Sequence, residues 1–342
     1  MPKGDLKPSP QYDLFTSFFG DPKELSNTIE LWDSIPKYAV SARQQHGMRD
    51  ENGRLPVHVT EFEYNSAMLD RPVRCRMKIK PALIEISEGQ FQDFYPSQAE
   101  EIIEEVLKKI FTDQQYGFHV AENNESWVRF TLYMIRKELR ARGHTRSLDE
   151  IKRSLEIMAA TSIDVEMEGR GRGVVYTNPI LTNVARTRRA DIEDDPEAKW
   201  TAQLPVLVSK SINELSYRQF NYALHMRLKT PLARWLHKRL VHRYRNASPL
   251  HSYTFAFSSV QRDSGLLRNV RISANVKSLT EALEELQTEK IVSSIEQEKR
   301  FEGRRLSDVI FTVYATREFT SEVKAASARI NDGQNKIKRI PR

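Results

Sequence analysis

Cysteine is almost absent from this sequence, because Cys75 is the one thiol in 342 residues. A single thiol cannot close an internal disulfide, and without a Cys-x-x-Cys pair the common zinc and redox motifs are excluded. Long apolar runs are missing as well: no stretch reaches the roughly 18 residues of a membrane span, and the first residues lack the apolar segment of a signal peptide. We therefore expect a cytoplasmic protein.

The motifs of common catalytic sites are also missing. The sequence has no GxxxxGK[ST] phosphate loop, no GxSxG and no HExxH. Its eight His residues are scattered, and His237 and His242 stand five apart, whereas a metal pair on one helix face needs a spacing of four. We expect no enzyme activity, no cofactor and no metal. A metal-dependent relaxase or nuclease stays as an alternative, because carboxylates are plentiful.

Negative charge is missing from one long window. The whole chain has a net charge of +7 and a pI of about 9.3, which favours nucleic acid or an acidic membrane face as partner. Between residues 215 and 262 there is no Asp or Glu, against nine Lys or Arg and four His. A predicted helix at 231–245 leaves Arg234, Lys238 and Arg243 on its solvent side. A solvated helix face is one interpretation, and contact with DNA phosphates is the one we favour.

The hydrophobic period predicts strands and helices in a definite order. Alternation at 72–86 indicates a strand with one charged face, and Ser147 with Glu150 forms a capping box that opens a helix. The remaining predicted elements are helices at 97–112, 127–143, 147–160 and 273–289, with strand pairs around the turns at 169–173 and 299–305.

This order occurs twice. The segment RSLEIMAATSIDVE (153–166) aligns with EALEELQTEKIVSS (281–294), and a second register that matches Ser147 to Ser278 is almost as good. In both copies an amphipathic helix leads into a strand, an Arg-containing turn and another strand. The pattern predicts an α+β protein with two tandem winged helix-turn-helix domains, small antiparallel sheets and an N-terminal extension.

The domain boundaries follow from these patterns. We expect an N-terminal extension of uncertain role at 1–96, a first winged-helix domain at 97–190, an acidic linker or loop at 191–199, a second winged-helix domain at 200–320, and a mobile basic tail at 321–342.

The candidate DNA-binding residues lie on the predicted recognition helices, the turns and the basic helix. Arg, Lys, Asn and Ser are the side chains that read base edges in the major groove or bind phosphates. The candidates are Arg146, Ser147, Lys152, Arg153, Arg170, Arg172, Arg186, Arg188, Arg234, Lys238, Arg243, Arg268, Asn269, Arg271, Ser273, Asn275, Lys277, Arg304 and Arg305.

Three stretches resemble a known family. NTIELWDSIPKY (27–38), residues 130–166 and LKTPLARWLHKRLVHRY (228–244) are similar to segments of iteron-binding replication initiators of theta-replicating bacterial plasmids. The resemblance covers roughly residues 97–316. It implies a protein associated with plasmid and nucleoid that binds direct repeats of double-stranded DNA, opens the origin, and recruits the host initiator ATPase and replicative helicase. It also implies homodimers and no membrane partner.

Two other functions remain open. A winged-helix transcriptional regulator or autorepressor would share every DNA contact named above. An RNA-binding protein is a weaker alternative, because the sequence has no aromatic run of the RNP type.

Overall fold

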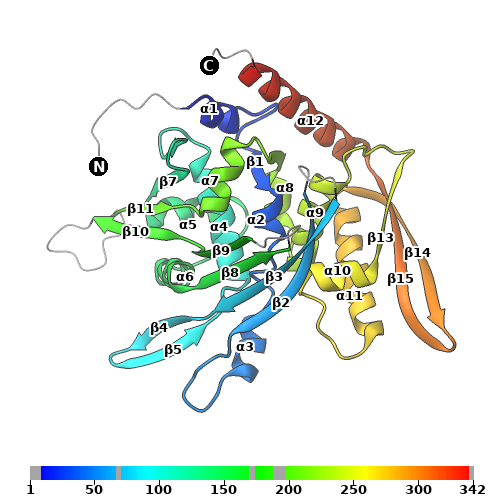
Figure 1. Cartoon of the computed structure of the whole chain (residues 1–342), viewed down its shortest axis with the longest axis horizontal. Coiled ribbons are helices and arrows are strands. Elements are labelled where there is room, and N and C mark those ends of the chain that lie inside the picture. The colour runs from blue at the N-terminus through cyan, green and yellow to red at the C-terminus, as the bar shows by residue number, and fades with distance from the viewer. Residues whose placement is uncertain (1–8, 67–70, 169–173, 188–197, 339–342) are drawn as a thin grey trace.

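We describe a computed structural model of the chain for residues 9–66, 71–168, 174–187 and 198–338. Helices occupy the middle of the molecule, and five small antiparallel sheets surround them (Figure 1). The sheets have the strand orders β1-β12, β10-β11-β7-β6, β13-β15-β14, β2-β3-β8-β9 and β4-β5. The described residues therefore form the mixed α+β architecture that the sequence predicts.

The first winged-helix unit begins with an amphipathic helix whose apolar stripe is buried. Ile103, Val106, Leu107 and Phe111 of this helix are at most 1% exposed, as the 3.6-residue period predicts. The elements of the unit are α4 (Gln98–Phe111), β6 (Gly117–Val120), β7 (Glu125–Phe130), α5 (Leu132–Ala141), α6 (Leu148–Ala160), β8 (Ser162–Met167), β9 (Val174–Pro179), β10 (Thr182–Thr187), β11 (Lys199–Gln203) and α7 (Val206–Asn213). Apart from Lys199, the last two lie beyond the expected start of the second domain at residue 200, and we group them with the first unit because β11 pairs with β7.

The second unit has the regular winged-helix order of helix, strand, two helices and a two-stranded wing. Its three strands pair in the order β13-β15-β14, so the wing hairpin shares a sheet with the strand that precedes the helix pair. The elements are β12 (Tyr217–Asn221), α8 (Tyr222–Arg227), α9 (Pro231–Arg243), β13 (Ser252–Ala256), α10 (Phe257–Ser264), α11 (Ile272–Thr288), β14 (Val292–Glu302), β15 (Arg305–Ala315) and α12 (Arg317–Lys338).

The repeat is confirmed in the first of its two registers. Leu155 and Met158 on α6, and Leu283 and Leu286 on α11, are all 0% exposed. The second register would match the N-cap Ser147 with Ser278, but Ser278 lies inside α11, which begins at Ile272. Helix α11 is therefore longer than α6 at its N-terminal end.

The N-terminal segment is joined to both units by backbone hydrogen bonds. Strand β3 pairs with β8 of the first unit, and β1 pairs with β12 of the second. A boundary at residue 96 is therefore not visible in the hydrogen bonding. The elements are α1 (Pro10–Thr16), β1 (Leu25–Ile29), α2 (Glu30–Ser34), α3 (Ala42–Met48), β2 (His58–Ser66), β3 (Arg71–Lys80), β4 (Ala82–Ser87) and β5 (Gln90–Phe94).

The expected mobile tail is wrong for residues 321–338, which belong to α12. Phe319 and Val323 of this helix are each 2% exposed. Arg329 donates to Asn27 at 2.6 Å and to the carbonyl oxygens of Leu14 and Phe15 at 2.8 Å. The helix is fixed by packing and by this buried guanidinium. Residues 191–197 of the expected linker lie outside the described residues.

Candidate nucleic-acid interface

Helix α9 does not present its charge to solvent. Arg234 is 1% exposed and donates to Glu101 at 2.7 Å. Lys238 donates to Asp33 at 3.0 Å and to Glu105 at 2.5 Å. Their carboxylate partners come from α2 and α4, outside the acid-free window. The prediction that Arg234 and Lys238 contact DNA is therefore wrong, because the chain itself neutralises them.

The C-terminal half of α9 is paired in the same way. Arg239 donates to Asp263 of α10 at 2.9 Å. The guanidinium of Arg243 lies 3.9 Å from the same carboxylate and donates to the carbonyl oxygen of Glu63 at 3.2 Å. Its side chain is 15% exposed. The expectation for Arg243 is also wrong, because its guanidinium joins α9 to β2 and α10.

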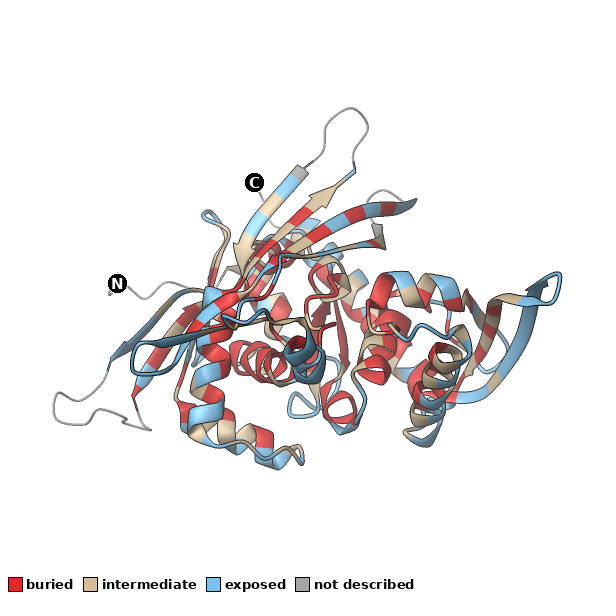
Figure 2. Cartoon of the chain, turned by 90° about the horizontal axis from the view of Figure 1, so that it is seen from below, coloured by how far each residue is buried: buried red, intermediate tan, exposed pale blue. Residues whose placement is uncertain are grey.

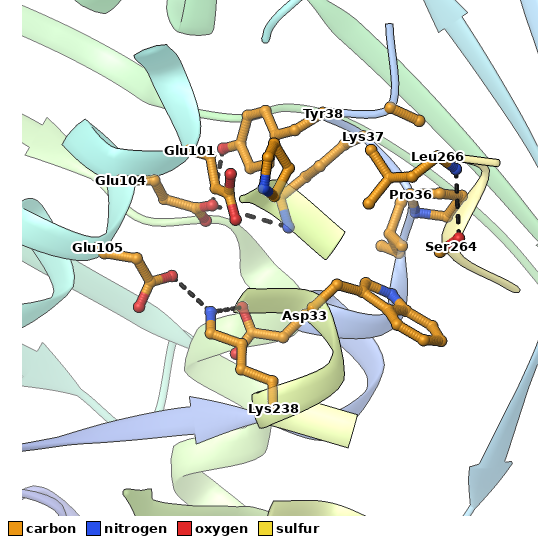
Figure 3. Close-up of a pocket in the computed structure, with 14 residues that line it drawn as sticks. Asp33, Pro36, Lys37, Tyr38, Glu101, Glu104, Glu105, Lys238, Ser264 and Leu266 are labelled. Atoms are coloured by element: carbon orange, nitrogen blue, oxygen red, sulfur yellow. Dashed lines mark hydrogen bonds and ion pairs between the residues drawn. The ribbon is translucent and has the colours of Figure 1, made fainter. Parts of the chain in front are cut away.

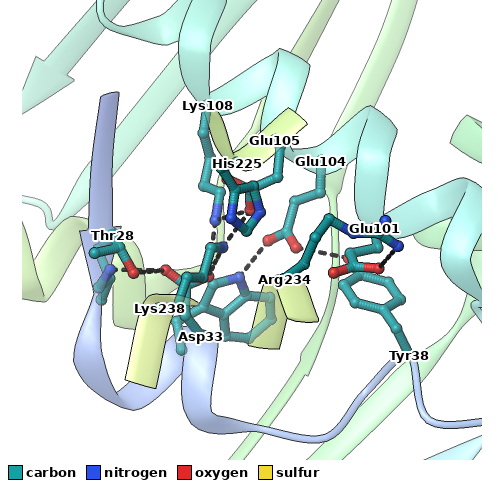
Figure 4. Close-up of polar contacts among 12 residues, drawn as sticks. Thr28, Asp33, Tyr38, Glu101, Glu104, Glu105, Lys108, His225, Arg234 and Lys238 are labelled. Carbon is teal, nitrogen blue, oxygen red and sulfur yellow. Dashed lines mark hydrogen bonds and ion pairs between the residues drawn. The ribbon is translucent and has the colours of Figure 1, made fainter. Parts of the chain in front are cut away.

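The two carboxylate partners of Lys238 belong to a buried ion cluster, which consists of Asp33, Lys37, Glu104, Glu105, Lys108 and Lys238. Lys108 lies 2.8 Å from Asp33 and 2.6 Å from Glu105 (Figure 4), and Lys37 lies 3.7 Å from Glu104. Burial alone would raise the pKa of Asp33, but the ammonium groups of Lys108 and Lys238 hold that pKa well below its ordinary value. The three carboxylates and three ammonium groups balance.

The buried ion cluster sits where the two units meet. Helix α4 opens the first unit and α9 opens the second, and α2 supplies Asp33 between them. A small cavity of about 40 Å³ beside the cluster is lined by Pro36, Trp235 and Leu266, among others (Figure 3). The charge of α9 therefore stabilises the contact between units.

Helix α6 begins at the predicted capping box. The Ser147 hydroxyl accepts from the N–H of Glu150 at 3.1 Å, and the Glu150 carboxylate accepts from the N–H of Ser147 at 2.7 Å. Arg146 lies 3.9 Å from the Glu150 carboxylate, with its side chain 38% exposed. Ser147 thus serves the helix N-terminus, and Arg146 stays at the surface beside it.

The outward face of α6 carries both signs of charge. Arg153 is exposed and Lys152 is half-buried, and Asp149 and Glu156 lie on the same side. With Leu83 of β4 they line an open hollow of about 630 Å³. The β4–β5 hairpin therefore forms one wall of the space in front of this recognition helix.

Two candidates beside α11 hold the loop that precedes the helix. Asn275 is 1% exposed, and its side chain accepts from the N–H of Asn269 at 2.9 Å and donates to the Asn269 carbonyl at 2.8 Å. Arg268 donates to the carbonyl of Gly265 at 2.6 Å and lies 2.9 Å from the His58 ring. Both predictions of base contact are wrong, because these side chains are used inside the fold.

The other α11 candidates face solvent. Arg271 at the N-cap position and Ser273 are exposed, as is the side chain of Asn269 in the preceding loop. The side chain of Lys277 is 77% exposed and lies 3.7 Å from Glu281. The N-terminal half of α11 is therefore the accessible cationic part of the helix.

The β14–β15 wing projects from the second unit (Figure 2), and β14 is exposed over most of its length, whereas β15 is half-buried or buried beyond Arg305. Arg304 and Arg305 are exposed at its tip. Gly303 makes the turn with φ of +63°, a left-handed conformation that glycine adopts without strain. Within the described residues, neither arginine pairs with a carboxylate.

The remaining candidates belong to the first unit. Arg186 is exposed on β10, with its guanidinium 5.7 Å from the Trp200 ring. Arg170, Arg172 and Arg188 lie outside the described residues.

Two exposed apolar residues beside the second recognition helix escaped the sequence analysis. Val270 is fully exposed, at 104%, directly before Arg271, and Phe301 is 58% exposed in the wing tip. The signal for Phe301 was its place between two pairs of basic residues, in the segment KRFEGRR. Apolar side chains in such positions contact thymine methyl groups or insert between base steps.

Metal binding and membrane insertion are two further classes of function to consider. The described residues contain no group of three or more His, Cys, Asp and Glu side chains that could hold a metal ion. Among the helices described, none combines the length and apolar character needed to cross a membrane.

Solved structures provide the comparisons for this architecture. A selenomethionine derivative of domains 2 and 3 of RctB has 12% sequence identity and a TM-score of 0.48, over 86% of this chain and 98% of that chain. A second crystal structure of RctB domains 2–3 has 12% sequence identity and a TM-score of 0.42, and the match covers 86% of this chain and 99% of that chain. Pi initiator protein in complex with iteron DNA has 10% sequence identity and a TM-score of 0.36, and the match covers 87% of this chain and 100% of that chain.

The third of these structures is an initiator protein bound to iteron DNA. No protein-family model and no curated protein sequence matches the chain. Because the TM-scores lie below 0.5, the candidate interface rests on this chain's own geometry.

Proposed function

We propose that the protein binds a specific sequence in double-stranded DNA through two winged-helix units, and that it initiates plasmid replication at direct repeats. The observation that carries the proposal is the second unit, where Arg271 and Lys277 on α11 and two arginines at the wing tip are exposed. In a winged helix the helix before the wing enters the major groove, and a basic wing reaches phosphates or the minor groove.

The first unit supplies a second recognition helix. Helix α6 exposes Arg153. In the repeat, α6 has the same position in the first unit as α11 has in the second, directly before the wing strands. Because the buried ion cluster joins α4 to α9, the two recognition helices are held in a fixed relation. Such an arrangement fits two major-groove segments of one site, spaced by about one helical turn.

The finer parts of the proposal follow from the family resemblance. They are opening of the origin, recruitment of the host initiator ATPase and replicative helicase, homodimer formation, and cytoplasmic association with plasmid and nucleoid. We propose that the protein acts without a catalytic site of its own.

Footprinting of the purified protein on the DNA that flanks its gene tests the proposal. We expect protection of tandem repeats beside an AT-rich tract. Protection of a single promoter site would favour an autorepressor, and uniform weak protection would contradict sequence-specific binding. Nicking of supercoiled DNA with magnesium or manganese would instead indicate a relaxase or nuclease.

A further inference from the structure

One face of the β10-β11-β7-β6 sheet is covered and the other is open. Val128, Phe130 and Ala202 are at most 2% exposed on the covered face. On the same face, the His119 ring lies 2.9 Å from the Ser126 hydroxyl and 2.8 Å from Asn213 of α7. Side chains alternate along a strand, so the residues between these point to the opposite face.

The open face carries an aromatic pair. Phe118 on β6 stands opposite Trp127 on β7 in the strand register. Their rings are nearly parallel, at 5° with centroids 6.1 Å apart. The Trp127 indole N–H donates to Glu125 at 3.2 Å, which fixes the orientation of the ring. Both side chains are half-buried, and Tyr116 beside them is 37% exposed.

Cations accompany these rings. The guanidinium of Arg129 lies 5.3 Å from the Phe118 ring. Helix α5 begins two residues after β7 ends, and its outward stripe consists of Tyr133, Arg136, Lys137 and Arg140. Tyr133 is 51% exposed, with the Arg136 guanidinium 5.5 Å from its ring. We take Phe118, Trp127, Arg129 and this stripe together as one candidate surface, which we call the aromatic–basic surface.

These cations differ from Lys78 and Lys80 of β3. On β3 the basic side chains form ion pairs across the sheet, Lys78 with Glu166 and Lys80 with Asp164, each at 3.1 Å. Among the described residues, no carboxylate pairs with the four cations of the aromatic–basic surface. Of the nearby acids, Glu125 accepts a hydrogen bond from the Trp127 indole and Glu138 accepts one from the Arg142 guanidinium. The surface is therefore open to an anionic partner.

We propose that the aromatic–basic surface is a binding site for single-stranded nucleic acid, separate from the duplex contacts of α11 and the wing. Aromatic rings on an open sheet stack with unpaired bases, and arginines beside them bind the phosphates. A duplex fits this surface poorly, because its bases already stack on one another. An acidic protein would satisfy the cations but would leave the parallel rings of Phe118 and Trp127 without a role.

Fluorescence anisotropy with the full chain tests the site. The probes are a labelled oligo(dT) of about 20 nucleotides, oligo(U) of the same length, and a strand of abasic sites with the same number of phosphates. We expect oligo(dT) or oligo(U) to bind at least about tenfold more tightly than the abasic strand. Equal affinity for the abasic strand would overturn the proposal, since any polyanion would then suffice.

Variants locate the binding. Trp127→Ala should weaken oligo(dT) binding by roughly 5- to 100-fold, the loss of one base–aromatic stack, while Trp127→Phe keeps most of it. Phe19→Ala removes an exposed aromatic residue, 43% exposed, that belongs to neither the wing nor the aromatic–basic surface, and it is the matched control, which should leave oligo(dT) binding unchanged. If Trp127→Ala does not fold, the exposed changes Arg129→Ala and Tyr133→Ala replace it. Unchanged oligo(dT) affinity in these folded variants would refute the site, whatever the result with duplex DNA.

Discussion

Substitution of Asp33 separates a structural role for α9 from a role in DNA binding. The Oδ1 atom of Asp33 accepts from Lys108 at 2.8 Å and from Lys238 at 3.0 Å. Its Oδ2 atom accepts from the Thr28 hydroxyl at 2.7 Å and from the N–H of Ile29 at 2.8 Å. In Asp33→Asn the single oxygen can serve one side only. If the asparagine oxygen accepts from Thr28 and Ile29, the amide NH₂ faces the ammonium groups of Lys108 and Lys238.

The magnitude follows from the charge balance of the buried ion cluster. Asp33→Asn leaves one positive charge unmatched in a site where Asp33 and Lys108 have side chains at most 4% exposed. Breaking a buried ion pair by removal of one partner costs about 3–5 kcal/mol. Lys238→Met removes a positive charge, so the double variant is balanced again. We expect the double variant to recover about 1–3 kcal/mol of the free energy of unfolding that Asp33→Asn loses.

Urea unfolding monitored by circular dichroism measures these differences, and anisotropy with the footprinted duplex measures DNA affinity below the unfolding transition. We expect all folded variants to bind duplex as the unsubstituted protein does, because Lys238 is enclosed. The reasoning is refuted if Lys238→Met unfolds like the unsubstituted protein and loses DNA affinity, since that pattern would place α9 on the phosphates.

Three further predictions concern the surface and the buried histidines. Arg271→Ala should cost roughly 1–3 kcal/mol of duplex affinity, concentrated at one base pair, and a uniform loss over all sequences would reassign Arg271 to phosphate. With about six phosphate contacts from α6, α11 and the wing, the logarithm of the DNA association constant should fall with the logarithm of salt concentration with a slope of about −5. A measured slope shallower than about −3 would contradict this interface. Burial lowers the pKa of His237 and of His242 to about 3. Below pH 6.5 the unfolded chain therefore binds protons at these rings that the folded chain does not. As the pH falls from 6.5 to 3, the free energy of unfolding should decrease by roughly 1.4 kcal/mol per pH unit for each ring. His242→Gln should reduce that slope in pH-dependent unfolding, and an unchanged slope in this variant would contradict the prediction.

Local patterns predicted the helices at 97–112, 147–160 and 273–289 to within a residue or two at each end. The helix expected at 127–143 is wrong at its start, because Glu125–Phe130 form strand β7 and the helix α5 begins at Leu132. The strand expected at 72–86 is divided into β3 and β4. The burial of Leu155 and Met158, and of Leu283 and Leu286 in the second copy, follows from a period of 3.6 residues that neighbouring positions alone determine. The charged face of β3 was predicted for the same reason, because alternation at 72–86 is a local property. These predictions depend on contacts within one element or between successive elements.

The environment of α9 depends on contacts that are distant in sequence. Arg234 pairs with Glu101 across 133 residues, and Lys238 pairs with Asp33 across 205. A window that counts charges along the chain cannot contain such partners. One signal was present: the helix at 98–111 contains four glutamates, and two of them, Glu104 and Glu105, are at most 2% exposed. An acid-rich helix and an acid-free helix in one chain complement each other.

Pairing inside the fold leaves the net charge of +7 unchanged, because each neutralised arginine or lysine also uses a carboxylate. The excess positive charge must therefore be carried by cations whose carboxylate partners are missing. In the part of the chain that the structure describes, such cations include Arg271, Arg304 and Arg305 in the second unit, and Arg129 and Arg140 in the first. The case for a polyanionic partner thus moves from α9 to these two surfaces. The surface of α11 and the wing has the shape of elements that enter the grooves of duplex DNA, and the aromatic–basic surface has the aromatic rings on which unpaired bases stack.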